Sequence, residues 1–277
     1  MMRTADTSQH YELDPEVFGL FLDPMRKYSC GIYESPSDTL AEAQVRKLHF
    51  VAGRLGLRGG ERLLDIGCGW GSLPLFMAQE YKCEVTGLSP AGRQHAYIRG
   101  LAAERGLSSR VNIRSGYFET AEFGVERYDG ITMLGSIVHM PDLAGVYSKA
   151  RSLLRKGGML YVSESCFRNA GMHARFDAEG GTRFVRESIY GSGEMRPLSD
   201  LVRAAEDAGL SVVAVDDLTD NYRRTIADWM TNAKARADEL NAHQPGLAEN
   251  MIRYFEICNA AWGYTTKHYA LTCSRSR

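Results

Sequence analysis

The sequence of 277 residues lacks several features that would point to particular classes of protein. It has no excess of one charge, with 33 basic and 34 acidic residues, which argues against a nucleic acid or an anionic membrane surface as the partner. It has no apolar run near the roughly 18–20 residues that a membrane-spanning helix needs. Its polar first residues also lack the hydrophobic region of a signal peptide. We therefore expect a cytoplasmic protein without an integral membrane segment.

Cysteine is sparse and shows no metal-binding pattern. The six cysteines form no C-x-x-C pair and no spacing with histidines that is typical of zinc sites. We expect free thiols in a reducing compartment and no metal site. With 44% hydrophobic residues, the chain can form one sizeable domain with an inserted subdomain, or two small domains.

What the sequence does contain, from residue 62 onward, is an alternation of apolar strands with amphipathic helices. The expected strands are 62–66, 83–88, 110–115, 128–134, 159–165, 210–218 and 268–273. The expected helices between them are 72–81, 90–105, 142–154 and 198–208. This alternation is typical of an α/β fold whose sheet is mostly parallel and carries helices on both faces.

Three segments interrupt the alternation. Residues 1–60 look helical and predict an N-terminal lid, whereas 61–277 predict the core. Within the core, residues 166–197 look irregular and residues 219–265 look like one or two helices, so both predict caps over the sheet. Helix starts are expected at Asp14 and Asp23, because a proline follows each. Such a lid would exclude water and would also allow exchange between the subunits of a homo-oligomer.

The strongest motif is the stretch LLDIGCGWG at positions 63–71. Asp65 closes the first strand, and Gly67, Gly69 and Gly71 line the turn into the next helix. Such a turn lets a ligand lie against bare backbone at the helix N-terminus. A dinucleotide fingerprint would need glycine in place of Ser72, and an acidic residue at the end of the second strand, which instead ends in GLS.

Five stretches together resemble the family of cyclopropane fatty acid synthases and mycolic acid methyltransferases, which are class I methyltransferases. They read LFLDPMRKYSCGIYE, TLAEAQVRKL, LLDIGCGWG, GLSPAGRQ and NYRRTIADW. The resemblance extends over nearly the whole chain. It implies a Rossmann-like sheet of seven strands, S-adenosylmethionine (SAM) as the methyl donor with S-adenosylhomocysteine (SAH) as its product, and no metal.

The resemblance also implies which residues surround the cofactor. The expected contacts are Tyr28, Ser29, Asp65, Gly67, Gly69, Gly71, Ser89, Gln94, Tyr117, Phe118 and Leu134. Tyr28 and Ser29 would close over the methionine end, and Ser89 and Gln94 would reach the ribose or its surroundings. At the positions that flank the adenine this chain has Tyr-Phe where the family usually has Trp-Glu, so ordinary core packing is the alternative for those two rings.

The catalytic positions depart further from the family. Its cyclopropane synthases methylate an alkene and hold a bicarbonate with a cysteine, a glutamate, a histidine and a tyrosine. Cys30 and Tyr222 match two of these positions, whereas Val138 replaces the glutamate and the histidine falls at about Val162. Because a buried anion needs hydrogen-bond partners that valine does not supply, we expect no ring formation by this route and an apolar chamber instead.

Two residues are candidate bases. His139 follows the fourth strand, at the edge where ligands bind in such sheets, and a free pKa near ~6.5 suits it to proton transfer. A structural role in bracing the loop is the alternative. Glu164, at the end of the fifth strand, is the rival base, and its alternative is a solvated carboxylate or a partner of a helix N-terminus.

Aromatic residues are candidates for the wall of the acceptor chamber. They are Phe18, Phe21, Tyr33, Phe167, Phe176, Phe184, Tyr190, Tyr222, Trp229, Trp262 and Tyr264. The resulting prediction is a SAM-dependent methyltransferase of a lipophilic small molecule in specialised metabolism, such as antibiotic biosynthesis in a bacterium. Methylation of an alkene or aromatic carbon is slightly favoured over oxygen or nitrogen. The alternatives are a cyclopropane synthase acting on an unsaturated lipid, and a SAM-binding cyclase that transfers no methyl group.

Overall fold

The computed structural model describes residues 15–125, 127–180, 183 and 193–276, and it confirms the predicted α/β architecture. In this part of the chain one seven-stranded sheet has the order β3-β2-β1-β4-β5-β7-β6. The strands are β1 (Arg62–Ile66), β2 (Glu84–Ser89), β3 (Val111–Ser115), β4 (Tyr128–Leu134), β5 (Leu154–Phe167), β6 (Leu210–Asp217) and β7 (Thr266–Arg275). Strands β1 to β5 pair in parallel, and β7 is antiparallel to both of its neighbours.

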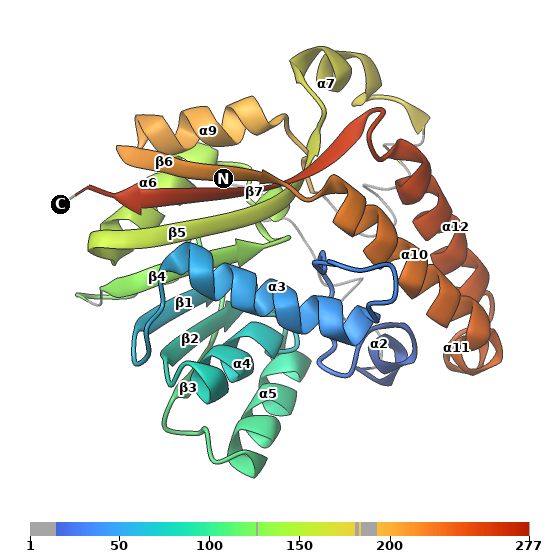
Figure 1. Ribbon diagram of the computed structural model, residues 1–277, viewed down its shortest axis with the longest axis horizontal. Coiled ribbons are helices and arrows are strands. Elements are labelled where there is room, and N and C mark those ends of the chain that lie inside the picture. The colour runs from blue at the N-terminus through green and yellow to red at the C-terminus, as the bar shows by residue number, and fades with distance from the viewer. Residues whose placement is uncertain (1–14, 126, 181–182, 184–192, 277) are drawn as a thin grey trace.

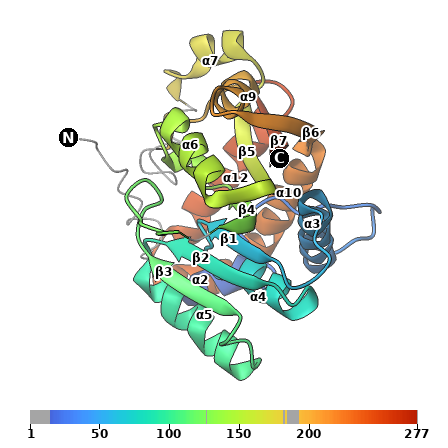
Figure 2. The ribbon, with the colours of Figure 1, turned by 90° about the vertical axis from the view of Figure 1, so that its left-hand side faces the viewer.

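Helices cover both faces of this sheet (Figure 2). Helices α3 (Leu40–Leu55) and α4 (Ser72–Glu80) bury one face, and α6 (Leu143–Leu153) and α9 (Leu198–Asp207) bury the other. Helix α5 (Gly92–Glu104) packs along β2 and β3. The apolar stripe of each amphipathic helix thus meets an apolar face of the sheet.

The strand order reverses at β1, which pairs with β2 on one side and with β4 on the other. The connections that leave β1 and β4 therefore diverge onto opposite faces of the sheet. In open α/β sheets this divergence leaves a crevice at the carboxyl ends of the strands, where ligands bind. The fold thus places the glycine-rich turn after β1 opposite the segment that carries His139.

A second layer of helices lies beyond the carboxyl ends of the parallel strands (Figure 1). It consists of α2 (Pro15–Phe21), α10 (Thr219–Ala235), α11 (Ala237–His243) and α12 (Leu247–Ala261). Segment 219–265 was expected to hold one or two helices and holds three, because Gly246 takes a left-handed backbone (φ 79°) ahead of α12. Among the described residues, no helix is long and apolar enough to cross a membrane.

Two further expectations are wrong. Segment 166–197, expected to be irregular, contains α7 (Ala170–Phe176), which begins where the Asn169 side chain accepts a hydrogen bond from the Met172 amide. The helix expected to start at Asp23 is absent. The Asp23 carboxylate instead accepts the amides of Met25 and Lys27 at 3.0 and 2.8 Å, which closes a turn.

Candidate cofactor and acceptor site

The glycine-rich turn owes its shape to three left-handed residues, Gly67, Gly69 and Gly71, with φ of 80°, 52° and 81°. A Cβ on Gly67 would lie 2.5 Å from Ser136 Cβ, and one on Gly71 would lie 2.6 Å from Ile98 Cγ1. No described atom lies within 4 Å of a Cβ on Gly69. Two of the glycines therefore allow close packing, and Gly69 presents bare backbone to open space.

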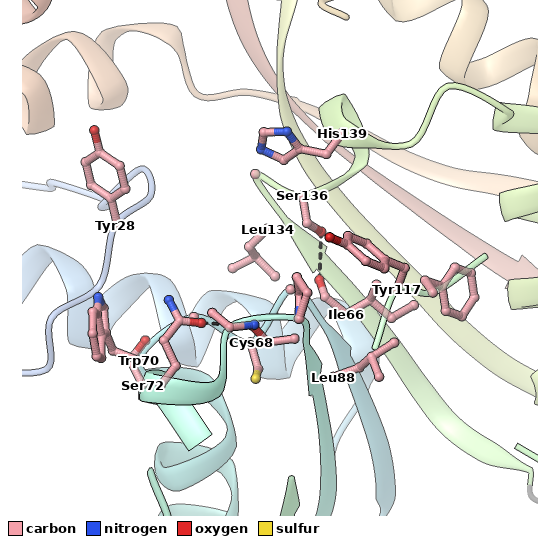
Figure 3. A pocket seen from close by; sticks show the side chains of 18 of the residues that line it. Tyr28, Ile66, Cys68, Trp70, Ser72, Leu88, Tyr117, Leu134, Ser136 and His139 are labelled. Atoms are coloured by element: carbon pink, nitrogen blue, oxygen red, sulfur yellow. Dashed lines mark hydrogen bonds between the residues drawn. The ribbon is translucent and has the colours of Figure 1, made fainter. Parts of the chain in front are cut away.

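A pocket opens above this turn, in the crevice between β1 and β4 (Figure 3). It encloses about 1060 Å³, including the part that is open to solvent. From the expected set, its lining includes Tyr28, Gly67, Gly69, Ser89, Gln94, Tyr117, Phe118, Leu134 and His139. Figure 3 shows the Tyr28 ring and the His139 imidazole on opposite sides of the open space, with Leu134 between them and nearer the sheet.

Ser29, Asp65 and Gly71 lie behind the pocket wall. Ser29 is held from α3, because Lys47 donates to its hydroxyl at 3.2 Å and the Gln44 side chain donates to its carbonyl oxygen at 2.7 Å. These contacts fix the segment that carries Tyr28. The structure therefore gives Ser29, Asp65 and Gly71 supporting positions, and direct contact with the cofactor stays a prediction for them.

The polar atoms around the pocket fit a polar ligand. Ser89 Oγ donates to Gln94 Oε1 at 2.9 Å, and this orients the amide so that Gln94 Nε2 has no hydrogen-bond partner among the described residues. Asp65 accepts from Thr132 through Oδ1 at 2.7 Å, while its buried Oδ2 also lacks a partner there. An unpaired buried group costs about 1–3 kcal/mol, and a hydroxyl group of a nucleoside could accept a hydrogen bond from Gln94 Nε2, since Gln94 borders the pocket.

The far end of the pocket is lined by Tyr117 and Phe118. Phe118 is also a core residue, 6.0 Å from Phe123 between ring centroids. Lys149 on α6 fixes this turn by donating to the carbonyl oxygens of Phe118 and Ala121, each at 2.6 Å. Core packing and a flat apolar wall are thus both present at this end, and a contact with adenine stays a prediction.

Several residues of the pocket lining were not predicted from the sequence. Trp70 lies within the glycine-rich motif, where only the glycines were used. Glu119 directly follows the Tyr-Phe pair, and Lys27 directly precedes Tyr28. Ser136 donates to the carbonyl oxygen of Ile66 at 2.7 Å and so ties the segment after β4 to the end of β1. Trp70, Glu119 and Lys27 each stand directly next to a predicted site residue, and this adjacency was the sequence signal that could have indicated them.

His139 ends a short 3-10 turn (Ile137–His139) that follows β4. His139 borders the pocket, which agrees with the expectation that ligands bind at the carboxyl end of the fourth strand. The turn is pinned on both sides, because Ser136 bonds to β1 and the Glu194 amide donates to the Val138 carbonyl oxygen at 2.8 Å. His139 is therefore held at the pocket on a fixed turn.

Glu164 does not reach the pocket. Its carboxylate accepts the amides of Val138 at 3.3 Å and Ser165 at 2.8 Å, and it borders a separate small cavity beside Glu194 and Arg196. Burial raises the pKa of Glu164 to about 7, although the hydrogen bonds from the two backbone amides act to lower this pKa. The Glu164 carboxylate thus supports the His139 turn from outside the cofactor pocket, and a role as the rival base stays a prediction.

Cys30 and Tyr222 are brought together in one apolar cluster, away from the lining of the cofactor pocket. The Cys30 thiol lies 3.1 Å from the Gly31 carbonyl oxygen, and burial raises its pKa, so that it stays protonated. Leu134 belongs both to this cluster and to the pocket wall. Leu134 thus links the cluster that holds the two matched catalytic positions to the wall of the cofactor pocket.

Val162 does not stand where it was expected. Its side chain packs into the core on the α6 side of the sheet, so the next residue, Ser163, faces Tyr222 and its surroundings. There the His268 ring on β7 is 2.9 Å from Ser163 Oγ and 4.4 Å from the Tyr222 ring centroid. Burial lowers the pKa of His268 to about 3, so its imidazole is neutral. A histidine therefore does lie beside Tyr222, but it is contributed by β7 and not by β5.

An aromatic cluster connects this polar group to the cofactor pocket. Tyr28 packs on Trp229 at 4.9 Å between centroids, and Tyr222 packs on Trp229 at 5.9 Å and on Trp262 at 5.1 Å. The expected wall residues Phe18, Phe21, Tyr33, Tyr222, Trp229 and Trp262 all belong to or pack against this cluster.

The remaining wall candidates lie elsewhere. Phe167 packs against His173 of α7, and Phe176 of α7 packs against Tyr264. These three rings therefore belong to the neighbourhood of α7 and not to the cluster beside the cofactor pocket. Phe184 and Tyr190 lie outside the described residues.

Comparison with known proteins agrees with this geometry. A family model described as mycolic acid cyclopropane synthetase matches residues 2–269. The methoxy mycolic acid synthase MmaA3 of Mycobacterium tuberculosis (strain ATCC 25618 / H37Rv) is 30% identical, with 93% of this chain and 90% of that protein covered.

Solved structures agree as well. The cyclopropane synthase MmaA2 from Mycobacterium tuberculosis superposes with a TM-score of 0.90 at 25% identity, covering 99% of this chain and 98% of that one. The mycolic acid cyclopropane synthase CmaA1, solved with SAH and CTAB, gives the same TM-score, identity and coverage. With SAM as its methyl donor, the chain is a class I methyltransferase that belongs to the mycolic acid cyclopropane synthetase family.

Proposed function

We propose that this enzyme methylates a lipophilic small molecule of specialised metabolism, and that an alkene or aromatic carbon is its acceptor. The observation that carries the proposal is the continuity of the aromatic cluster with the cofactor pocket. Tyr28 borders the pocket and packs on Trp229, which leads to Tyr222 and Trp262. An acceptor that lies along these rings would present its carbon next to the methyl donor.

Methyl transfer requires the protein mainly to align the acceptor with the methyl donor and to exclude water. SAM, when bound, supplies a methyl group activated by a sulfonium. When one carbon of an alkene or aromatic ring takes this methyl, the π electron pair forms the new bond and the neighbouring carbon becomes cationic, so a proton must then be lost. The faces of Tyr28 and Trp229 suit a cation held nearby. His139 lies across the pocket from Tyr28 (Figure 3), and this position supports the proposal that it takes the proton.

The second candidate is a cyclopropane synthase on an unsaturated lipid, the activity that the names of several relatives carry. The neighbourhood of Cys30 and Tyr222 favours it, because His268 and Ser163 supply polar groups beside Tyr222. The position of Val138 opposes it, since valine provides no side-chain partner for a buried anion. We therefore rank ring formation second.

Methyl transfer from radiolabelled SAM into an extract of bacterial metabolites tests the first proposal. We expect label in an organic-soluble small molecule, with SAH formed in equal amount. Label recovered only in phospholipid or in acyl carrier protein, with a ring in the product, would reverse the ranking of the two candidates. SAH binding without label in any acceptor would overturn both and favour a cyclase that only binds the cofactor.

A further inference from the structure

Four charged side chains are buried together beside the cofactor pocket. Lys27 is 6% exposed, Lys47 2%, Asp23 4% and Asp65 1%. They attract or repel one another through space, since Asp65 and Asp23 act on Lys27, and Lys27 acts on Lys47. A cluster of this kind is costly unless each charge is compensated, so the partner of every charged group matters.

Three of the four groups are bonded at least in part. Asp23 accepts the backbone amides of Met25 and Lys27, Lys47 donates to Ser29 Oγ at 3.2 Å, and Asp65 accepts from Thr132. The Lys27 ammonium has no hydrogen bond and no ion pair to any described residue. Burial lowers the pKa of Lys27, and Asp65 and Asp23 oppose that shift.

Lys27 borders the pocket, as does Tyr28, its neighbour in the chain. Tyr117 lies on the side opposite to Tyr28, as Figure 3 shows. The flat rings of Tyr117 and Phe118 suit the purine of a nucleoside, and this leaves the Tyr28 side for the amino-acid group of the cofactor. The carboxylate is the anionic part of SAM, whereas its sulfonium and amino group would be repelled by a lysine.

We propose that Lys27 binds the cofactor carboxylate and thereby makes the amino-acid group necessary for tight binding. Asp65 and Asp23 keep the ammonium charged from behind, without an ion pair that would compete for it. The proposal rests on SAM being the cofactor and on no particular acceptor. It makes Lys27 a specificity-determining residue of the cofactor site.

Three nucleosides separate this role from a general contribution to the fold. SAH carries both the carboxylate and the amino group, decarboxylated SAH (S-adenosyl-3-thiopropylamine) keeps only the amino group, and 5′-methylthioadenosine has neither. Calorimetric titration of each ligand would be carried out on the wild type, Lys27→Met and Lys27→Arg. Arg26→Met is the matched control, because its guanidinium borders the same pocket but lies over the Tyr97 ring at 4.7 Å.

We expect Lys27→Met to weaken SAH binding by about 10- to 100-fold, the range of a hydrogen bond between charged groups. Binding of decarboxylated SAH and of methylthioadenosine should change by less than about 3-fold, because neither ligand offers a carboxylate. Lys27→Arg should recover most of the loss. Arg26→Met should leave the ratio of SAH to methylthioadenosine affinity as in the wild type.

The ratio of two affinities measured on one protein sample does not depend on the fraction that is folded. An equal loss for all three ligands in Lys27→Met, or no loss for SAH, would overturn the proposal. So would a ratio that falls equally in Arg26→Met, since a diffuse positive potential would then explain the preference. If the wild type bound none of the nucleosides, the cofactor assignment itself would fail, and the proposal with it.

Discussion

The two halves of the site are built differently. The cofactor half rests on one short loop, in which three glycines within five residues set both the backbone path and the close approach of Ser136 and Ile98. The acceptor half is assembled from distant segments. The Gly31 amide donates to Thr225 Oγ1 at 3.0 Å, and the Tyr28 ring packs on Trp229.

The difference shows where each half can vary. A loop that must take left-handed conformations and pack against neighbouring elements tolerates few residue types. Aromatic rings on separate helices can change size and contacts while the sheet below stays the same. We therefore expect substitutions in the cofactor half to weaken cofactor binding, most of all in the glycine-rich loop, and substitutions in the acceptor half to change which acceptor is used.

The largest effect is expected for Gly69→Val. Its side chain would project into the open space that the cofactor needs, at a φ of 52° that β-branched residues rarely adopt. SAH affinity should fall at least ~10³-fold, as measured by calorimetry. The control Gly100→Ala, on α5 with open space around its Cβ, should bind SAH like the wild type. Near-normal binding by Gly69→Val would show that the cofactor does not lie against this loop.

The next effect concerns stability and comes from Glu164, a buried residue whose carboxylate accepts the Val138 amide of the His139 turn. Its pKa is about 7 in the folded protein against an ordinary value of 4.5. The folded state therefore holds the proton more tightly, and stability from this group is complete below pH 4.5 and is lost as the pH rises to about 7. At about 1.36 kcal/mol per pH unit the loss is on the order of 3 kcal/mol.

Urea unfolding of the wild type and of Glu164→Gln at pH 5 and pH 7.5 measures this loss. The amide keeps one acceptor oxygen and does not titrate, so the variant should lose about 2 kcal/mol less than the wild type between the two pH values, because part of the total loss already occurs below pH 5. The exposed control Glu104→Gln on α5 should keep the wild-type dependence. The same pH dependence in Glu164→Gln would mean that another buried group titrates in this range.

A kinetic effect of ~10²-fold on turnover is expected for His139→Ala, because His139 is the only histidine on the described pocket wall and a positioned base contributes at least that much. SAH affinity should stay within a few-fold. Single-turnover transfer of labelled methyl measures the step, and His243→Ala on α11, remote from the pocket, serves as control. Unchanged turnover would assign His139 to bracing of the loop.

The contrast between the local cofactor loop and the acceptor half built from distant segments also explains how much of the site could be predicted from the sequence. The alternation of strands and helices and the glycine-rich turn are local patterns, and they predicted the sheet and the position of Gly67 and Gly69, whereas Ser89 and Gln94 were expected from the resemblance to the family. His268 was not predicted, because its contacts with Ser163 and Tyr222 join three segments far apart in the chain. Nor could the pattern of β5 alone show that Val162 packs into the core on the α6 side, because neighbouring residues of a strand face opposite sides of the sheet.

The smallest predicted effect tests the contrast most directly. Trp229 in the aromatic cluster is almost fully buried, and its indole N–H has no hydrogen-bond partner among the described residues. Trp229→Phe keeps a ring and removes this donor, so the acceptor KM should rise about 3- to 5-fold, the equivalent of one neutral hydrogen bond. The cofactor KM should stay unchanged.

Trp70→Phe is the matched variant in the cofactor half, since Trp70 borders the pocket. It should raise the cofactor KM by a similar factor and leave the acceptor KM unaltered. Steady-state kinetics with each substrate varied in turn would measure both effects. If both variants changed both constants, the two halves would be coupled through the Phe18 ring, which lies 5.3 Å from Trp70 and 6.2 Å from Tyr28 between centroids. The acceptor half could then not vary independently of the cofactor half.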